Sequence, residues 1–301
     1  MSIEEKVRMA VRGRPWLRRL LLPGLWIIKL RWHFLALTGF PVTYRAQGKR
    51  LRLHPVGQIA RLLAVGNFES LERSFVSVYL RPGMNMVNVG ANIGLYVVLA
   101  SSLVGPNGIV FAFEPSTETF DRLWENLELN GCRNAITVRS VVSDVPGQVM
   151  LRNDPQNPVL DGHRYVETLT NVGVRLASDE IVEAVVLDDY LASFGKGTPP
   201  RIDLMIIDVE GAELSVLRGA LETLTRNDAT ILLECSKNCV EVEQLLIELG
   251  YQFWNWDPRA RRLTPADFQD LSSKQDVIVR RRGWEAGGRA HQVVHADGGL
   301  G

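Results

Sequence analysis

Apolar runs alternate with helical patterns across the middle of the chain. The runs lie at residues 84–89, 109–113, 136–142, 202–207 and 229–233. Such short, predominantly apolar runs are typical of strands that are buried on both faces of a sheet. Helical patterns at 95–103 and 118–130 separate the first three runs. The alternation predicts an α/β domain with a Rossmann-like, mostly parallel sheet and helices on both faces.

The segments on either side of this repeat predict further elements. Residues 41–54 have the pattern of a β-hairpin that turns at Gln47 and Gly48. Helical patterns at 57–65 and 69–80 follow, so residues 41–83 are expected to form a hairpin and helical cap. At the other end, a helix at 239–249 and strands at 251–256 and 276–280 complete a domain that covers residues 84–282, and the last strand is expected to run antiparallel.

One segment, residues 147–186, does not fit the alternation. Runs at 149–151 and 183–187 are predicted to pair as strands, and about thirty polar residues lie between them. Loops of this length in compact domains usually have a function or are disordered. We therefore expect residues 152–182, which include His163, Arg164 and Tyr165, to form a substrate lid. A histidine in such a loop is more often solvated than catalytic.

The first run ends in a glycine-rich turn, in which Gly90, Asn92 and Gly94 form the pattern G-x-N-x-G before a helix. Glycine lets a ligand approach the backbone, and the first amides of the helix face that ligand. Glu114 ends the second run, twenty residues after Gly94, where a nucleotide-binding βαβ unit has the acid that accepts ribose hydroxyls. The third glycine of dinucleotide-binding turns is missing. An adenosine ligand without a pyrophosphate, S-adenosylmethionine, therefore fits better.

The chain contains motifs that resemble those of the FkbM family of methyltransferases. In order, they are NVGANIG at 88–94, AFEP at 112–115, LWENLELN at 123–130, LDDY at 187–190 and IDVEGAE at 207–213. The resemblance covers about residues 66–256 and implies a class I methyltransferase with a seven-stranded, mostly parallel sheet and one antiparallel strand. It implies an enzyme that depends on S-adenosyl-L-methionine and most often methylates a hydroxyl on a sugar, a glycan or a polyketide-like natural product.

This resemblance, together with the strand positions, implies a set of cofactor-binding residues. Asn92 and Glu114 are expected at the methionine and ribose ends of the cofactor, and Asp144 at the adenine. A turn acid before a Pro-Gly pair is an equal interpretation of Asp144. Asn88 stands where the family usually has Asp, which is expected to weaken or rearrange contacts around the methionine part. The full set is Asn88, Gly90, Asn92, Gly94, Glu114, Ser143, Asp144 and Asp208.

Acidic residues follow the fourth and fifth runs: Asp208, Glu210 and Glu234. If the chain stays extended after residue 207, alternation puts Asp208 and Glu210 on the same side. Several ionised carboxylates on one edge are costly unless they bind a cation, a proton donor or substrate hydroxyls. We predict that all three are catalytic, with Asp208 favoured as the base for an acceptor hydroxyl, or that they bind a divalent metal. The alternatives are a helix cap for Glu213 and a salt bridge for Glu210.

Composition restricts the partners and the compartment. The chain has 34 basic and 34 acidic residues, so its charge gives no reason to expect nucleic acid as a partner. Its three cysteines are too few for a disulfide framework, which favours a reducing compartment and a cytoplasmic location. Cys235 and Cys239 are expected to be ordinary thiols rather than zinc ligands.

Residues 1–40 form a basic arm that contains tryptophans. Lys29, Arg31 and His33 interrupt its best apolar run, which is then too short for a spanning helix, and no cleavage site of a signal peptide follows. The pattern favours a helix that covers its own domain or a second copy in a homo-oligomer, or else a peripheral contact with the inner membrane surface. The glycine-rich tail at 283–301 is expected to be disordered.

The expected acceptor is a small molecule or a glycan, and two other classes of function stay open. An NAD- or nucleotide-sugar-dependent oxidoreductase would use a similar strand, turn and helix. A non-catalytic scaffold would bind S-adenosylmethionine without turnover, and Asn88 would then mark the decay of the site. Binding of NAD in place of S-adenosylmethionine would select the first alternative, and cofactor affinity without turnover the second.

Overall fold

The computed structural model describes residues 37–55, 70–153, 164–168, 178–194, 198–235, 238–266 and 277–281. The chain divides into two compact units, Met1–Ser70 with Val159–Gly162 and Leu71–Pro158 with His163–Gly301. The arm at 1–36, the helical pattern at 57–65, His163 and the tail at 283–301 lie outside the described residues, so what the sequence predicts for them stays a prediction. Within the described ranges, no helix has the length and apolar character needed to span a membrane.

The described part of the first unit is a β-hairpin, which confirms the prediction for residues 41–54. Strand β1 (Val42–Ala46) pairs antiparallel with β2 (Lys49–Leu53). Gln47 and Gly48 turn the chain with φ angles of 50° and 77°. A two-residue turn with both φ angles positive matches the right-handed twist of the strands, and this explains why the sequence forms so tight a hairpin.

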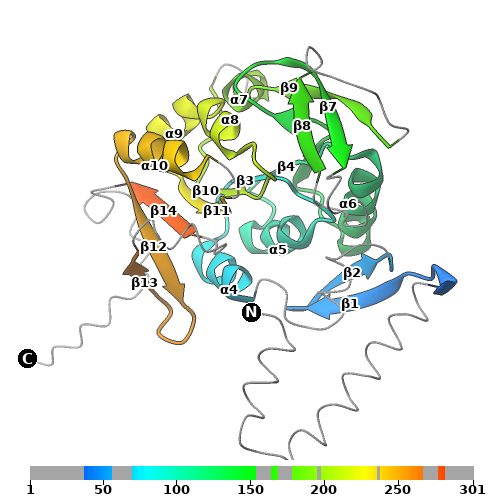
Figure 1. Ribbon diagram of the computed structural model, residues 1–301. Helices are drawn as coiled ribbons and strands as arrows, with labels where there is room; N and C mark the ends of the chain where they lie inside the picture. Colours follow the sequence, from blue (N-terminus) through cyan, green and yellow to red (C-terminus); the bar gives the residue numbers. More distant parts are fainter. Residues whose placement is uncertain are drawn as a thin grey trace, which may run out of the picture. The chain divides into compact units, whose positions relative to one another are not determined.

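The second unit contains an eight-stranded sheet with the order β13-β12-β14-β11-β10-β3-β4-β5 (Figure 1). Its strands are β3 (Met86–Val89), β4 (Val110–Phe113), β5 (Ala135–Val138), β10 (Leu204–Ile207), β11 (Thr230–Leu233), β12 (Tyr251–Asp257), β13 (Arg262–Pro265) and β14 (Val277–Arg281). Strands β5, β4, β3, β10 and β11 are parallel, and β14 runs antiparallel between β11 and β12. These strands and β12 confirm the predicted seven-stranded, Rossmann-like sheet. Strand β13 extends it by an eighth, antiparallel strand that no pattern predicted.

Helices cover both faces of this sheet, as predicted (Figure 1). They are α4 (Ser70–Tyr79), α5 (Leu95–Val104), α6 (Thr117–Asn130), α7 (Leu187–Phe194), α8 (Glu213–Arg218), α9 (Leu221–Asn227) and α10 (Cys239–Glu248). Val87 and Val89 join Leu217 and Leu246, from α8 and α10, in one buried cluster. Because side chains alternate along a strand, Asn88 belongs to the opposite face.

Two motifs of the resemblance support the fold rather than the chemistry. In the LWENLELN motif, the buried Asn126 donates from Nδ2 to the carbonyl oxygen of Ile93 at 2.9 Å and so holds the glycine turn to α6. In the LDDY motif, the carboxylate of Asp188 accepts from the backbone N–H groups of Glu222 at 2.8 Å and Thr223 at 2.9 Å. Asp188 therefore caps the start of α9 from outside that helix.

A second, four-stranded sheet lies between β5 and α7 in the chain, with the order β6-β9-β7-β8. Its strands are β6 (Val141–Val142), β7 (Gly147–Asn153), β8 (Arg164–Thr168) and β9 (Glu180–Val185). The antiparallel pair of β7 and β9 confirms the predicted pairing across the segment. The second sheet was otherwise not predicted.

The loop prediction for residues 152–182 is wrong at 164–168, which form β8. Val166 stands opposite Leu151 of β7 and packs against the small core of this sheet, and Glu167 forms an ion pair with Arg152 at 2.7 Å. Together with the pairing to β7, these cross-strand contacts stabilise β8 as the edge strand of the second sheet. The predicted strand at 136–142 is also wrong as a single element, because β5 ends at Val138 and β6 joins the second sheet. Residues 152–153 and 180–182 of the predicted lid likewise belong to strands, β7 and β9, and residues 154–163 and 169–177 lie outside the described residues.

Candidate active site

The residues that directly follow the parallel strands form a row along the carboxyl edge of the main sheet. The last residues of these strands are paired in register, from Leu233 through Ile207, Val89 and Phe113 to Val138. Neighbouring strands lie about 4.8 Å apart, so the residues that follow them are close neighbours. The row consists of Glu234, Asp208, Gly90, Glu114 and Arg139. The structure thus brings together four residues that the sequence predicted separately.

The glycine turn between β3 and α5 is fixed by backbone contacts. The N–H groups of Gly90 and Ala91 both donate to the carbonyl oxygen of Phe113, at 3.0 and 2.9 Å. Gly90 and Gly94 have φ angles of 81° and 90°, and Asn92 has one of 47°. A Cβ atom on Gly94 would meet only the terminal Cδ1 of Leu123 closely, at 2.6 Å, so it is the φ angle of 90° that favours a glycine there.

Glu114 is buried beside this turn. Its Oε2 accepts from the backbone N–H of Asn92 and its Oε1 from that of Ser116, both at 3.0 Å. Burial raises the pKa of Glu114 to about 7, while the two N–H groups and the charge of Arg164 act in the opposite direction. A carboxylate offers about four acceptor positions. Glu114 therefore keeps acceptor capacity for a ligand at the end of β4.

Two polar side chains near Glu114 are buried without a partner. Asn88 is 1% exposed, and neither its Oδ1 nor its Nδ2 has a hydrogen-bond partner among the described residues. The same holds for Oγ of Ser140, which is 3% exposed and follows the end of β5. Leaving such a group unsatisfied costs about 1–3 kcal/mol. Both side chains are therefore suited to bind a polar ligand.

The acidic segment after β10 does not continue as an extended chain. The N–H of Gly211 donates to the carbonyl oxygen of Val209 at 2.7 Å, and Gly211 has a φ angle of 91°. The condition that would put Asp208 and Glu210 on one side is therefore not met. The same N–H donates to Oε1 of the buried Glu213 at 3.1 Å, so this carboxylate holds the turn before α8, and the capping interpretation of Glu213 stays a prediction.

The acids of the row do not gather into a cluster of three or more metal ligands. Among the residues that the structure describes, no three or more His, Cys, Asp or Glu side chains are arranged to hold a metal ion. The metal alternative for Asp208, Glu210 and Glu234 therefore finds no support in their geometry. Cys235 is a buried free cysteine, and burial and the neighbouring Cys239 raise the pKa of its thiol. This favours the protonated form of the Cys235 thiol.

The structure does not bring Ser143 and Asp144 to the end of β5. They follow β6, and the N–H of Ser143 donates to the carbonyl oxygen of Val185 in the second sheet at 2.9 Å. The carbonyl oxygen of Ser143 is 2.2 Å from the position of a Cβ atom on Gly219, so this loop packs on the end of α8. The residues that follow β5 are instead Arg139 and Ser140. Sequence reasoning missed Ser140 because the predicted strand ran on through this turn.

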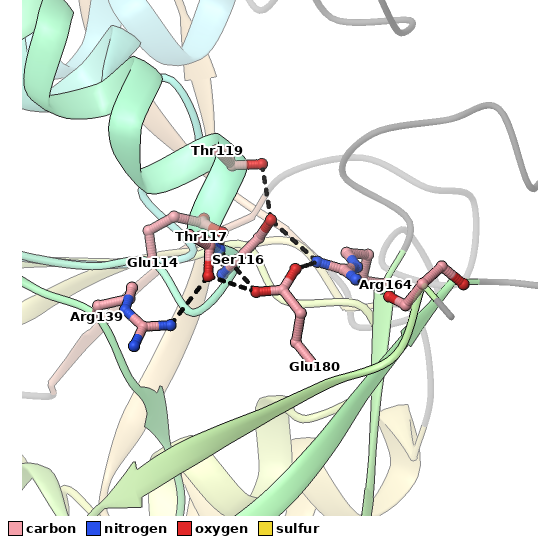
Figure 2. Close-up of polar contacts among 8 residues, drawn as sticks. Glu114, Ser116, Thr117, Thr119, Arg139, Arg164 and Glu180 are labelled. Atoms are coloured by element: carbon pink, nitrogen blue, oxygen red, sulfur yellow. Dashed lines mark hydrogen bonds and ion pairs between the residues drawn. The ribbon is translucent and has the colours of Figure 1, made fainter. Parts of the chain in front are cut away.

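A network of polar side chains joins the second sheet to the start of α6 (Figure 2). Arg164 of β8 donates to Oγ of Ser116 at 3.0 Å and to Oε1 of Glu180, while Oε2 of Glu180 accepts from the N–H of Thr117 at 2.9 Å and from its hydroxyl at 2.7 Å. Arg139 donates to the same hydroxyl at 3.0 Å. Sequence reasoning named Arg164 only as a lid residue, since its partners are far away in the chain.

These groups fit the polar parts of S-adenosylmethionine. Its ribose hydroxyls need an acceptor such as Glu114, and its charged methionine part and its adenine need donors and acceptors such as Asn88, Ser140 and the amides of the glycine turn. A ligand that binds there would satisfy side chains that are otherwise buried without partners. The donor set is therefore suited to this cofactor.

A model of a methyltransferase family matches the chain over the whole of this edge. It is described as Methyltransferase FkbM domain, and it matches residues 88–253. The match begins within β3 at Asn88 and ends within β12, and it includes every residue of the row. It covers more than half of the 301 residues.

Similarity to individual proteins covers much of the same region. The hexuronic acid methyltransferase AglP of Haloferax volcanii is 29% identical over 197 residues, which are 65% of this chain and 69% of that protein. Methyltransferase sdnD of Sordaria araneosa is 30% identical over 212 residues, with 62% of this chain and 82% of that protein covered. The crystal structure of methyltransferase FkbM from Methylobacillus flagellatus is 14% identical, with a TM-score of 0.42, and the match covers 73% of this chain and 54% of that one.

Proposed function

The chain belongs to the FkbM methyltransferase family, and we propose that it uses S-adenosyl-L-methionine to methylate a hydroxyl oxygen on a sugar, a glycan or a polyketide-like natural product. The observation that carries this proposal is the position of Glu114. Its buried carboxylate follows β4, stands next to Gly90 in the row and accepts from the N–H of Asn92 in the glycine turn. A carboxylate at this point of a nucleotide-binding βαβ unit supports ribose binding.

Glu114, Asn88 and Ser140 would hold the cofactor. The acceptor positions that Glu114 retains suit the two ribose hydroxyls. The amide of Asn88 is neutral, so it hydrogen-bonds the methionine part without adding a charge, unlike the Asp that the family usually has. The hydroxyl of Ser140 suits the adenine, and we prefer it to Asp144 because Asp144 is exposed and follows a strand of the other sheet. When bound, S-adenosylmethionine supplies an electrophilic methyl group.

We assign the role of general base to Asp208. An alcohol is a poor nucleophile at neutral pH, so its proton must pass to a base as the new carbon–oxygen bond forms. Asp208 stands next to Gly90 on one side and next to Glu234 on the other. The proton thus goes to Asp208, the methyl group to the acceptor oxygen, and S-adenosylhomocysteine is released.

The acceptor class is supported by a relative. One similar protein is a hexuronic acid methyltransferase, which favours a sugar acid or a glycan that contains one. The test incubates the full-length chain with labelled S-adenosylmethionine and a panel of acceptors, namely hexuronic acids and their glycosides, neutral sugars and hydroxylated polyketides. Label is expected in a methyl ether formed at a hydroxyl of a sugar-type acceptor. Turnover is expected to be equal with and without a chelator.

The outcomes separate the alternatives. Tight binding of S-adenosylmethionine without transfer to any acceptor would favour the non-catalytic scaffold, for which Asn88 is the sequence argument. Loss of turnover in the chelator would contradict a protein base that acts without a metal. Binding of NAD in place of S-adenosylmethionine in calorimetry would overturn the proposal itself.

A further inference from the structure

Strand β8 of the second sheet reaches the residues that surround Glu114. Its first residue, Arg164, donates from Nη1 to Oγ of Ser116 at 3.0 Å and from Nη2 to the carbonyl oxygen of Ser178 at 2.6 Å (Figure 2). The backbone N–H of Ser116 in turn donates to Oε1 of Glu114 at 3.0 Å. Arg164 is thus linked to the carboxylate at the end of β4 through a single residue.

Strand β9 holds the same backbone segment from a second point. Glu180 binds Arg164 with one carboxylate oxygen and receives the N–H and the hydroxyl of Thr117 with the other. Ser116, the residue before α6, makes no capping bond of its own to this helix, and the carboxylate that accepts from the first N–H of the helix, that of Thr117, comes from the second sheet. A carboxylate there also interacts favourably with the helix dipole. The direction of the Ser116 amide is therefore set by β8 and β9.

The same two side chains act on the charge of Glu114. Arg164 lowers the pKa of Glu114 and Glu180 raises it, both by charge at a distance. Its neighbours in the row are Gly90 and Arg139, so Arg139 is the charged residue directly beside it, and Asp208 lies one strand further away. Because Arg164 is the cation bonded to the hydroxyl of Ser116, whose N–H binds Glu114, its loss would change both the orientation and the ionisation of Glu114.

We propose that Arg164 is a positioning residue of the cofactor site, by which the second sheet holds the carboxylate of Glu114 in the orientation that binds S-adenosylmethionine. This inference rests on the proposed role of Glu114. Arg164 acts through Ser116 and need not touch the cofactor. The second sheet is then part of the cofactor site as well as an insertion in the fold.

Arg152 offers a matched control for a purely structural role of Arg164. It lies on β7 of the same sheet, and its side chain is 14% exposed, compared with 15% for Arg164. Its ion pairs are with Glu167 at 2.7 Å and Asp179 at 3.3 Å. Arg152→Gln and Arg164→Gln therefore remove equally buried guanidinium groups from one sheet, but only the second removes the contact with Ser116.

The experiment measures the Kd of S-adenosylmethionine by calorimetry, from pH 5.5 to 8.5, for the full-length wild type and both variants. Arg164→Gln is expected to weaken binding about tenfold, the loss of one charge-assisted hydrogen bond. In this variant the pKa of Glu114 is expected to rise because the nearby cation is gone. On acidification, binding of S-adenosylmethionine is therefore expected to be lost at a higher pH than in the wild type. Arg152→Gln is expected to leave both the Kd and its pH profile unchanged.

A smaller change keeps the test decisive if Arg164→Gln does not fold. Ser116→Ala removes the hydroxyl that Arg164 binds and keeps the N–H that faces Glu114. It is expected to weaken binding in the same direction, with no further loss when it is combined with Arg164→Gln. Equal effects of Arg164→Gln and Arg152→Gln, or no effect of Ser116→Ala, would overturn the role of Arg164. A wild type that does not bind S-adenosylmethionine would instead overturn the proposed function.

Discussion

The carbonyl oxygen of Asp208 occupies the space where a side chain on Gly90 would begin, because a Cβ atom built on Gly90 lies 1.9 Å from that oxygen. The N–H of Asp208 also donates to the carbonyl oxygen of Val89 at 3.1 Å. The turn proposed to hold the cofactor and the residue proposed as the base are therefore joined by their backbones. Their separation is fixed by the sheet and not by side-chain rotamers.

This contact predicts a large cost for Gly90→Ala. Gly90 and Gly83 have φ angles of 81° and 84°, but a Cβ atom on Gly83 meets nothing within 4 Å. Gly83→Ala is expected to lose about 1–2 kcal/mol of unfolding free energy from backbone strain alone. Gly90→Ala is expected to lose about 1–3 kcal/mol more from overpacking. Urea unfolding of both variants measures the difference, and equal losses would contradict a tight contact with Asp208.

Much of the edge could be predicted from the sequence because its signals are local. Gly90, Gly94 and Glu114 are recognised by their spacing and by the apolar runs that precede them. Each parallel strand of the main sheet leaves its next residue at the same edge, so Asp208 and Glu234 were expected beside them. The pairing in register confirms this part of the prediction.

The rest depends on contacts between residues that are distant in the chain. Arg164 and Ser116 are 48 residues apart, and no local pattern links them. The turn after Ile207 was not foreseen because the tight bend at Gly211 depends on the buried Glu213. Ser140 was hidden because the run around it looked like one strand, whereas the chain changes sheets there.

The raised pKa of Glu114 predicts a pH dependence of stability. Burial raises this pKa from 4.5 to about 7, so the folded state disfavours the ionised form. The stability contribution of Glu114 is full below the pKa of the unfolded chain and is lost as pH rises through about 7. The loss amounts to about 3 kcal/mol. Unfolding of wild type and Glu114→Gln at pH 4.5 and pH 8 measures it, since groups common to both proteins cancel. A constant difference between the two proteins would refute this view of Glu114.

Asn88 is expected to favour binding of S-adenosylmethionine and to lower the free energy of unfolding of the free protein. Replacing it by Leu removes a buried amide that has no partner among the described residues, so Asn88→Leu should leave the unfolding free energy unchanged or raise it by about 1–3 kcal/mol. Asn126 is equally buried but donates to Ile93, and Asn126→Leu should lower the same free energy. Of the two variants, only Asn88→Leu is expected to combine a stable fold with weak binding of S-adenosylmethionine. A destabilised Asn88→Leu would show that the amide is satisfied in the free protein.

The last prediction concerns the proposed base. Asp208→Asn keeps the shape of the side chain and the backbone contact with Gly90, so the Kd of S-adenosylmethionine is expected to change little. Turnover is expected to fall about 10²–10⁴-fold, the usual contribution of a general base. Glu210→Gln is the matched control, because Glu210 lies in the turn after β10 and outside the row of residues next to the strands. Single-turnover transfer of label measures the chemical step for both variants. If Asp208→Asn retains the wild-type rate, the proton must go elsewhere, and Glu234, its neighbour in the row, becomes the next candidate.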